Sequence, residues 1–108
     1  MKSLLIFYYF LSSAYSASKE EWRGKAIYQL MTDRFYRTDG STAPCNNLRS
    51  YCGGTFKGIQ SQLDYIANLG FDAIWISPIP ENMESDPSGY SGYNALDWYR
   101  CNPHFGTE

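Results

Sequence analysis

The sequence predicts an α/β fold organised around one strand–helix–strand unit, and three observations support this. The segment Ala26–Phe35 opens with a short apolar run, as a buried strand does. Apolar residues then recur at helical spacing, and Phe71–Ile79 forms a second apolar run. Because a helix lies between two strands in sequence, we expect the strands to be parallel and the crossover to be right-handed.

The predicted helix follows a loop, 36–54, that is dense in Gly, Ser, Thr, Asn, Asp and Pro. Thr55 can cap the helix at its start, and Gly70 stands where a left-handed residue would end it. The apolar residues that share one helix face, at spacings of three, four and three, are Phe56, Ile59, Leu63 and Ile66. One helix is therefore expected over this segment.

The second apolar run has Ile74, Trp75 and Ile76 at its centre, and we expect Trp75 to lie in the core. Both strands look buried on both faces, and a parallel sheet requires cover on each. Two strands and one helix do not supply that cover, so we expect the polypeptide to continue past Glu108. After this run the sequence predicts a polar loop over 80–91 and an aromatic-rich segment over 93–99.

The first residues have the layout of a secretory signal peptide. Lys2 precedes the unbroken apolar run Leu4–Leu11, and the small residues Ala14 and Ser16 stand at the −3 and −1 positions of a cut after residue 16. A membrane anchor is the alternative, but eight apolar residues span only about 12 Å as a helix, against a hydrocarbon core of about 30 Å. We therefore expect residues 1–16 to be removed and residues 17–108 to be secreted, with no membrane attachment after cleavage.

Length and charge limit the classes of function. The 108 residues suit one small domain at most. The chain carries a net charge of −2 and only 9 Lys and Arg, without a basic stripe, so nucleic-acid binding is not expected. Aromatic residues make up 18% of the chain, well above the content of a disordered acidic segment.

Three cysteines are present, and export would place them in an oxidising environment. Cys45 and Cys52 flank a short segment rich in turn formers, and a disulfide between them would restrict the unfolded chain. A zinc site is a weaker reading, because four ligands are needed and the only histidine, His104, is far along the chain. Cys101 has no evident partner, which leaves a missing partner, an intermolecular bond or a free thiol.

An ordered series of motifs covers essentially all of residues 17–108. The motifs are WRGKAIYQLMTDRF (22–35), RTDGS (37–41), CGGTFKGI (52–59), LDYI (63–66), GFDAIWISP (70–78), GY (92–93), DWY (97–99) and NPHFGT (102–107). Their order and gaps are more specific than any single piece, and together they resemble the secreted fungal-type α-amylases of glycoside hydrolase family 13.

The resemblance implies that the chain is the N-terminal part of a (β/α)8 TIM barrel, with two strands, one helix and loops present here. It implies hydrolysis of internal α-1,4 bonds in starch-like glucans with retention, through two carboxylates. The catalytic carboxylates and main calcium ligands of the family come from later strands, so no catalytic or metal residue is assigned in this chain. The complete enzyme would bind calcium and α-glucan polysaccharides or oligosaccharides, act outside the cell and be a monomer.

One substrate contact follows from the resemblance. Tyr93 matches the family tyrosine whose ring stacks on the sugar beside the cleavage point, although it could instead only cover the barrel rim. Ser91 and Asn94 stand where the family often has His and Trp, which changes the detail of this subsite. The family's local disulfide maps onto Cys45 and Cys52, although this loop is one residue shorter.

The remaining polar and charged candidates have mainly structural interpretations. Asp33 and Arg34, at the end of the first strand, are expected to form an ion pair or to tether a loop rather than to catalyse. Asp97 is expected to fix its loop through backbone hydrogen bonds, and His104 to be a solvated loop residue. The small acidic loop is expected to be solvent-exposed surface rather than a calcium site, and its members are Glu81, Glu84 and Asp86.

Three functional hypotheses follow. The first is the N-terminal portion of a secreted α-amylase, which would be inactive alone because hydrolysis requires both an acid and a nucleophile. The second is a short, non-catalytic secreted glycan-binding protein that uses its aromatic loops, and its weakness is the uncovered sheet. The third keeps the barrel and replaces hydrolysis by α-glucan transfer, a choice made by loops beyond residue 108.

Overall fold

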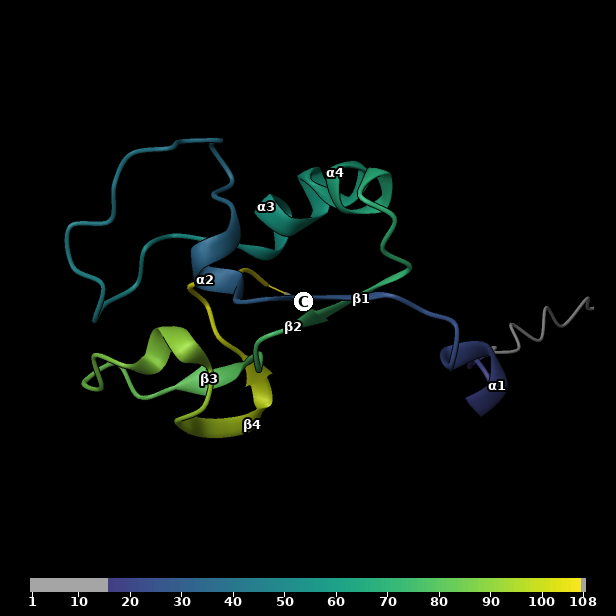
Figure 1. Cartoon of the computed structure of the whole chain (residues 1–108). Helices are drawn as coiled ribbons and strands as arrows, with labels where there is room; N and C mark the ends of the chain where they lie inside the picture. Colours follow the sequence, from purple (N-terminus) through teal and green to yellow (C-terminus); the bar gives the residue numbers. More distant parts are fainter. Residues whose placement is uncertain (1–15, 108) are drawn as a thin grey trace, which may run out of the picture.

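The computed structural model describes residues 16–107, so the expected signal peptide lies almost entirely outside the described residues. Two small sheets make up the centre of the molecule, with helices α3 and α4 beside the first sheet (Figure 1). The elements in chain order are α1 (Lys19–Trp22), β1 (Ile27–Leu30), α2 (Thr32–Phe35), α3 (Phe56–Ser61), α4 (Leu63–Asn68), β2 (Ala73–Ile76), β3 (Pro80–Asn82), the 3₁₀ turn η1 (Gly89–Ser91) and β4 (Ala95–Cys101).

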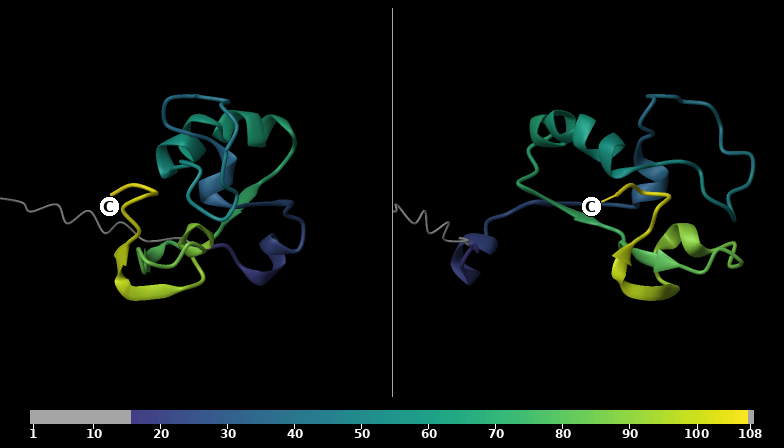
Figure 2. Two further views of the ribbon diagram at one scale, coloured as in Figure 1. Left: turned by 90° about the vertical axis from the view of Figure 1, so that its left-hand side faces the viewer. Right: turned by 180° about the vertical axis from the view of Figure 1, so that it is seen from behind.

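The expected parallel strand pair is confirmed. Strand β1 pairs with β2 in parallel register, from Ile27 opposite Ala73 to Leu30 opposite Ile76. The crossover between them runs through α3 and α4, which lie together on one side of the pair in all views (Figure 2). The amino end of the pair is closed by Asp72, whose carboxylate accepts hydrogen bonds from the Ala26 N–H at 2.9 Å and from Lys25 Nζ at 3.1 Å.

The crossover helix begins and ends where the sequence predicts, but it is interrupted. The Thr55 hydroxyl accepts a hydrogen bond from the Gly58 N–H at 2.9 Å, which caps α3, and Gly70 follows α4 with a φ of +91°. Gln62, at φ −111° and ψ 10°, divides the segment into two helices. The expectation of one continuous helix is therefore wrong at this residue, although Ile59 and Ile66 still face the same core.

The first apolar segment is also shorter as a strand than expected. Strand β1 ends at Leu30, and the polar residues that follow form the helical turn α2 rather than more strand. The backbone turns there because the Asp33 carboxylate is bonded to the loop at Cys52 and Gly53, which draws this segment away from the sheet direction.

The hydrophobic core lies between the sheet and the crossover helices. Leu30, Ile59 and Ile66 are buried, and Tyr28 and Ile76 pack against them. Because side chains alternate along a strand, the residues between these point to the opposite face, where the described residues supply no helix. Trp75 lies on that second face and is 60% exposed. Its expected place in the core is wrong for residues 16–107, because one face of this two-stranded sheet is open.

The segment after β2 contains an antiparallel strand pair that the sequence analysis assigned to loop. Strand β3 pairs with β4 from Pro80 opposite Cys101 to Asn82 opposite Ala95, with register shifts between successive pairs. The short length of β3, its initial proline and these shifts conceal the strand pattern in the sequence. The expected count of two strands and one helix is therefore too low. Within residues 16–107, no helix is long and apolar enough to span a membrane.

Candidate functional site

The carboxyl ends of β1 and β2 are joined by a buried pair of hydroxyl residues. The Thr32 N–H donates to Ser77 Oγ at 3.0 Å, and Ser77 Oγ lies 3.3 Å from Thr32 Oγ1. Both residues are buried, so these bonds satisfy polar groups that would otherwise be costly in the interior. The pair fixes the two strand ends relative to each other at the edge where barrel enzymes carry their active sites.

A shallow cavity of about 280 Å³ opens beside these strand ends. The residues that line it are Gln29, Leu30, Met31, Ile76, Ser77 and Tyr93. Tyr93 comes from the loop before β4 and is 70% exposed, so its ring is available to a ligand. The structure thus brings the predicted substrate-contact residue to the carboxyl ends of both parallel strands.

The position of Tyr93 is set by the glycine before it. Gly92 has a φ of +81°, and a Cβ at this position would collide with the Pro78 carbonyl oxygen just after β2. A residue with a side chain would be strained in this backbone region as well as too large, so only glycine lets the loop approach the strand end this closely. The Tyr93 N–H then donates to Ser91 Oγ at 3.3 Å.

The other side of this loop is held by a buried asparagine. Asn82 Nδ2 donates to the Pro80 carbonyl at 2.7 Å, and Asn82 Oδ1 accepts from the Asn94 N–H at 2.9 Å. Asn94, which stands where the resemblance leads one to expect Trp, also reaches Ser88 Oγ with its amide. Asn94 therefore stabilises this loop through hydrogen bonds at a position where the resemblance implies an aromatic side chain.

Asp33 serves the loop rather than catalysis, as the sequence analysis expects. It is 2% exposed, and its carboxylate accepts from the Cys52 N–H at 2.8 Å and from the Gly53 N–H at 3.2 Å. Arg34 Nε lies 3.0 Å from Asp33 Oδ2 and forms an ion pair with it. These partners hold the buried Asp33 carboxylate against the backbone of residues 52 and 53.

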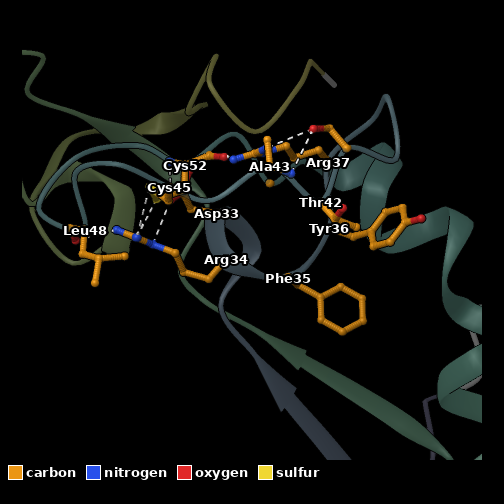
Figure 3. A pocket seen from close by; sticks show the side chains of 12 residues that line it. Asp33, Arg34, Phe35, Tyr36, Arg37, Thr42, Ala43, Cys45, Leu48 and Cys52 are labelled. Carbon is orange, nitrogen blue, oxygen red and sulfur yellow. Dashed lines mark hydrogen bonds and ion pairs between the residues drawn. A yellow bond between two sulfur atoms is a disulfide. The ribbon is translucent and has the colours of Figure 1, made fainter.

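The disulfide implied by the resemblance is present between Cys45 and Cys52. We call residues 45–52 the disulfide loop. Figure 3 shows its sulfur atoms beside the Arg34 guanidinium, at one end of a cavity of about 350 Å³ that also reaches Arg37 and Thr42. Cys101 lies half-buried on β4 and forms no disulfide with a described residue.

His104 lies exposed in a turn, as expected, and it also has partners that the sequence does not reveal. Its ring stacks on Tyr51 with a centroid distance of 3.7 Å, and its Nε2 lies 3.0 Å from Glu84 Oε1. Burial raises the pKa of Tyr51 above its usual value, while the hydrogen bond that its hydroxyl accepts from Asn102 at 2.9 Å acts in the opposite direction. These partners could not be foreseen because Tyr51 and Glu84 are distant from His104 in sequence and meet it only through folding.

The acidic residues before Gly89 form no shared cation site. Glu81 lies 3.3 Å from Arg100 Nε, Glu84 pairs with His104, and Asp86 accepts from the Ser88 hydroxyl and N–H at 2.6 and 2.8 Å. The bonds from Ser88 lower the pKa of the Asp86 carboxyl. Across residues 16–107, no group of three or more His, Cys, Asp or Glu side chains could hold a metal ion.

Asp97 accepts a hydrogen bond from the Tyr99 N–H at 2.8 Å, as its expected loop-fixing role requires. The buried polar residues that the sequence did not single out are Thr32, Ser77, Asn82 and Asn102. Their common signal is a polar side chain next to an apolar run or a turn, which is too frequent in proteins to identify them in advance.

Comparisons with known proteins agree on one family. Residues 29–108 match the family described as "Alpha amylase, catalytic domain". The chain is 52% identical to α-amylase 3 of Schizosaccharomyces pombe, over 92% of this chain and 20% of that protein. It is thus about a fifth as long as this curated relative.

Solved structures give the same result. An α-amylase from Malbranchea cinnamomea is 53% identical with a TM-score of 0.79, over 84% of this chain and 20% of that one. An α-amylase from Geobacillus thermoleovorans, complexed with acarbose, is 45% identical with a TM-score of 0.69, over 80% of this chain and 18% of that one. The β1–β2 unit with its crossover helices is thus part of a (β/α)8 barrel, and the chain belongs to the α-amylase catalytic-domain family of glycoside hydrolases.

Proposed function

We propose that residues 17–108 are the N-terminal part of the catalytic barrel of a secreted α-amylase, preceded by a signal peptide at 1–16. The complete enzyme hydrolyses internal α-1,4 bonds of starch-like glucans with retention and acts as a monomer outside the cell. Membership of the α-amylase catalytic-domain family and about 50% identity to named α-amylases support this proposal.

The observation that carries the proposal is the exposed ring of Tyr93 above the carboxyl ends of β1 and β2. A pyranose ring presents a face of C–H groups that packs against an aromatic ring, and tyrosine supplies that area with little loss of side-chain freedom. Ser91 is shorter than the histidine often found there in the family and reaches less far toward a sugar hydroxyl. We therefore assign Tyr93 to a glucan subsite.

The catalytic step requires residues other than those that surround Tyr93. Retaining hydrolysis requires two carboxyl groups about 5–5.5 Å apart, one as nucleophile and one as acid and base. Asp33 is buried and accepts hydrogen bonds from backbone N–H groups, and Asp97 on β4 accepts one from the Tyr99 N–H, so we assign neither carboxylate to this role. We infer that the chain alone binds glucan without hydrolysing it.

Calcium is proposed for the complete enzyme only. Each of the three carboxylates between β3 and η1 has a different partner, so they do not converge on one point. Glu81 pairs with Arg100, Glu84 with His104, and Asp86 with Ser88. Because calcium requires six to eight oxygen ligands, these three carboxylates do not fit such a site. No step of the proposed chemistry passes through calcium held by residues 16–107.

A chimeric enzyme tests the proposal. Residues 17–108 replace the matching segment of the Malbranchea cinnamomea α-amylase, and kcat/KM for maltoheptaose is measured with Tyr93 or with alanine in its place. Tyr93→Ala is expected to lower kcat/KM about fivefold to tenfold, because one aromatic contact with the sugar is lost. Tyr99→Ala is the matched control, since Tyr99 is 94% exposed on β4 and lines no cavity found at the strand ends, and it should leave kcat/KM unchanged.

Two results would contradict the proposal. A folded but inactive chimera would remove the amylase assignment of this segment. Equal effects of Tyr93→Ala and Tyr99→Ala would remove the subsite assignment of Tyr93 while leaving the barrel in place.

A further inference from the structure

We propose that Arg34 is a positioning residue that couples the disulfide loop to the loop that carries Tyr93, an inference that rests on the proposed glucan subsite. We call residues 89–94 the tyrosine loop. These two loops are separated by about forty positions in sequence, yet one guanidinium group contacts both.

The first set of Arg34 contacts reaches the disulfide loop. Its Nη2 donates to the carbonyls of Leu48 at 2.8 Å and Ser50 at 2.9 Å, and its Nη1 lies 2.6 Å from Cys52 Sγ. Figure 3 shows the Arg34 guanidinium beside Leu48 and the two cysteines. Several donors of one planar group are therefore used to hold a loop whose ends are already joined by the disulfide.

The second contact reaches the tyrosine loop. The guanidinium carbon of Arg34 lies 4.0 Å from the centroid of the Tyr90 ring, a cation–π geometry. Tyr90 is the central residue of η1, and Gly92 directly follows this turn, its N–H donating to the Gly89 carbonyl at 3.1 Å. Displacement of Tyr90 would thus be transmitted over three residues to Tyr93.

A second contact between the two loops supports the coupling. Gly89 lies so close to Tyr51 that a Cβ there would be only 2.7 Å from the Tyr51 hydroxyl oxygen. Two adjacent residues of η1 therefore connect the tyrosine loop to the disulfide loop, Tyr90 through Arg34 and Gly89 through Tyr51.

Arginine suits this place better than lysine. The Arg34 guanidinium is planar and presents several donors in fixed directions while its face stays free to stack, whereas an ammonium group is a point charge. The ion pair with Asp33 fixes the base of the group and neutralises its charge in a region where the Arg34 side chain is only 23% exposed. Arg34→Lys keeps the charge and removes both the fork and the stacked face.

Backbone amide exchange in the full chain tests this coupling without a ligand. In Arg34→Lys, the amides of Ser91 and Gly92 are expected to exchange about fivefold to tenfold faster, as for the loss of one cation–π contact. The Ser77 amide, which donates to the Leu30 carbonyl between β1 and β2, should exchange at the unchanged rate. Tyr90→Leu should reproduce the effect, and Tyr90→Phe, which keeps the ring, should not.

Arg100→Lys is the matched control, because Arg100 is an exposed arginine whose one ion pair among residues 16–107 is with Glu81. Unchanged Ser91 and Gly92 exchange in both Arg34→Lys and Tyr90→Leu would overturn the coupling. Equal acceleration at Ser77 would also overturn it, since that pattern indicates a general loss of stability rather than a positioning role.

Maltoheptaose titration of the same variants separates this inference from the proposed function. Arg34→Lys is expected to raise the Kd for maltoheptaose about fivefold, whereas Arg100→Lys should leave this Kd unchanged. If the unaltered chain does not bind maltoheptaose, the proposed subsite fails, and amide exchange still decides whether Arg34 couples the loops. If the chain binds and Arg34→Lys has the same Kd, the positioning of Tyr93 by Arg34 is wrong.

Discussion

The two halves of the molecule are held together by different forces. The parallel half, β1–β2 with α3 and α4, is built on apolar packing around Leu30, Ile59 and Ile66. The other half, the disulfide loop with β3, η1 and β4, is built on buried polar residues, one disulfide and stacked rings. Figure 1 shows the two halves meeting where β2 passes into β3. Apolar packing together with the Thr32–Ser77 hydrogen bonds thus fixes the strand ends, and the polar network fixes the loop that places Tyr93 above them.

The largest expected effect breaks the parallel half. Ile66→Ala removes a side chain that is 3% exposed and is expected to lower the free energy of unfolding by about 2–5 kcal/mol, because the cavity cannot be filled by its neighbours. Urea unfolding followed by fluorescence measures this change. Leu69→Ala, just after the same helix and 53% exposed, should have a much smaller effect; equal effects would contradict the assigned core.

An intermediate effect is expected in the polar half. Asn82→Ala removes a buried side chain and leaves the part-buried Asn94 N–H without its acceptor, which should lower the free energy of unfolding by about 1 kcal/mol. Amide exchange should accelerate at Asn94 and not at Ser77 if the two halves open separately. Asn47→Ala removes a similar amide in the exposed disulfide loop and should change neither site. Equal acceleration at Asn94 and Ser77 would show that the halves unfold as one unit.

The smallest expected effect is that of Asp72, the exposed carboxylate that accepts hydrogen bonds at the amino end of the β1–β2 pair. Hydrogen bonds from the Ala26 N–H and then from Lys25 lower the pKa of Asp72 below its ordinary value of 3.8. As the pH falls, Asp72 is protonated in the unfolded chain before it is protonated in the folded chain. The ionised carboxylate therefore stabilises the folded state above pH 3.8, and this stabilisation is lost as the pH falls through the lower pKa of the folded state.

Thermal unfolding at a series of pH values measures this contribution. Asp72→Asn should have a slightly lower midpoint than the unaltered chain at neutral pH, and the two midpoints should converge in acid. A difference that persists or grows below pH 3.8 would contradict the assigned role of the carboxylate.

The parallel half could be predicted from sequence because its signals are local. Apolar runs, helical spacing, the Thr55 cap and Gly70 all act within a few residues, and they predicted the strand–helix–strand order. Gln62 was missed because the apolar spacing of three and four residues continues across the break.

The polar half was largely hidden because its contacts join residues that are far apart in sequence. Tyr51 bonds Asn102 across 51 positions, and His104 meets Glu84 across 20. The spacing of polar side chains along the sequence does not indicate which residues they bond, so the roles of these residues appear only in the folded structure. Tyr93 was singled out through the family motif, and its contact with glucan stays a prediction.

The most direct test of the glucan subsite is a crystal structure of the chimeric amylase, with its acid/base carboxyl removed, bound to maltoheptaose. We expect one glucose ring to pack face to face on Tyr93 above the ends of β1 and β2, with Arg34 stacked on Tyr90 as it is here. A bound oligosaccharide that leaves the Tyr93 ring uncovered would contradict the subsite and, with it, the function proposed for this part of the barrel.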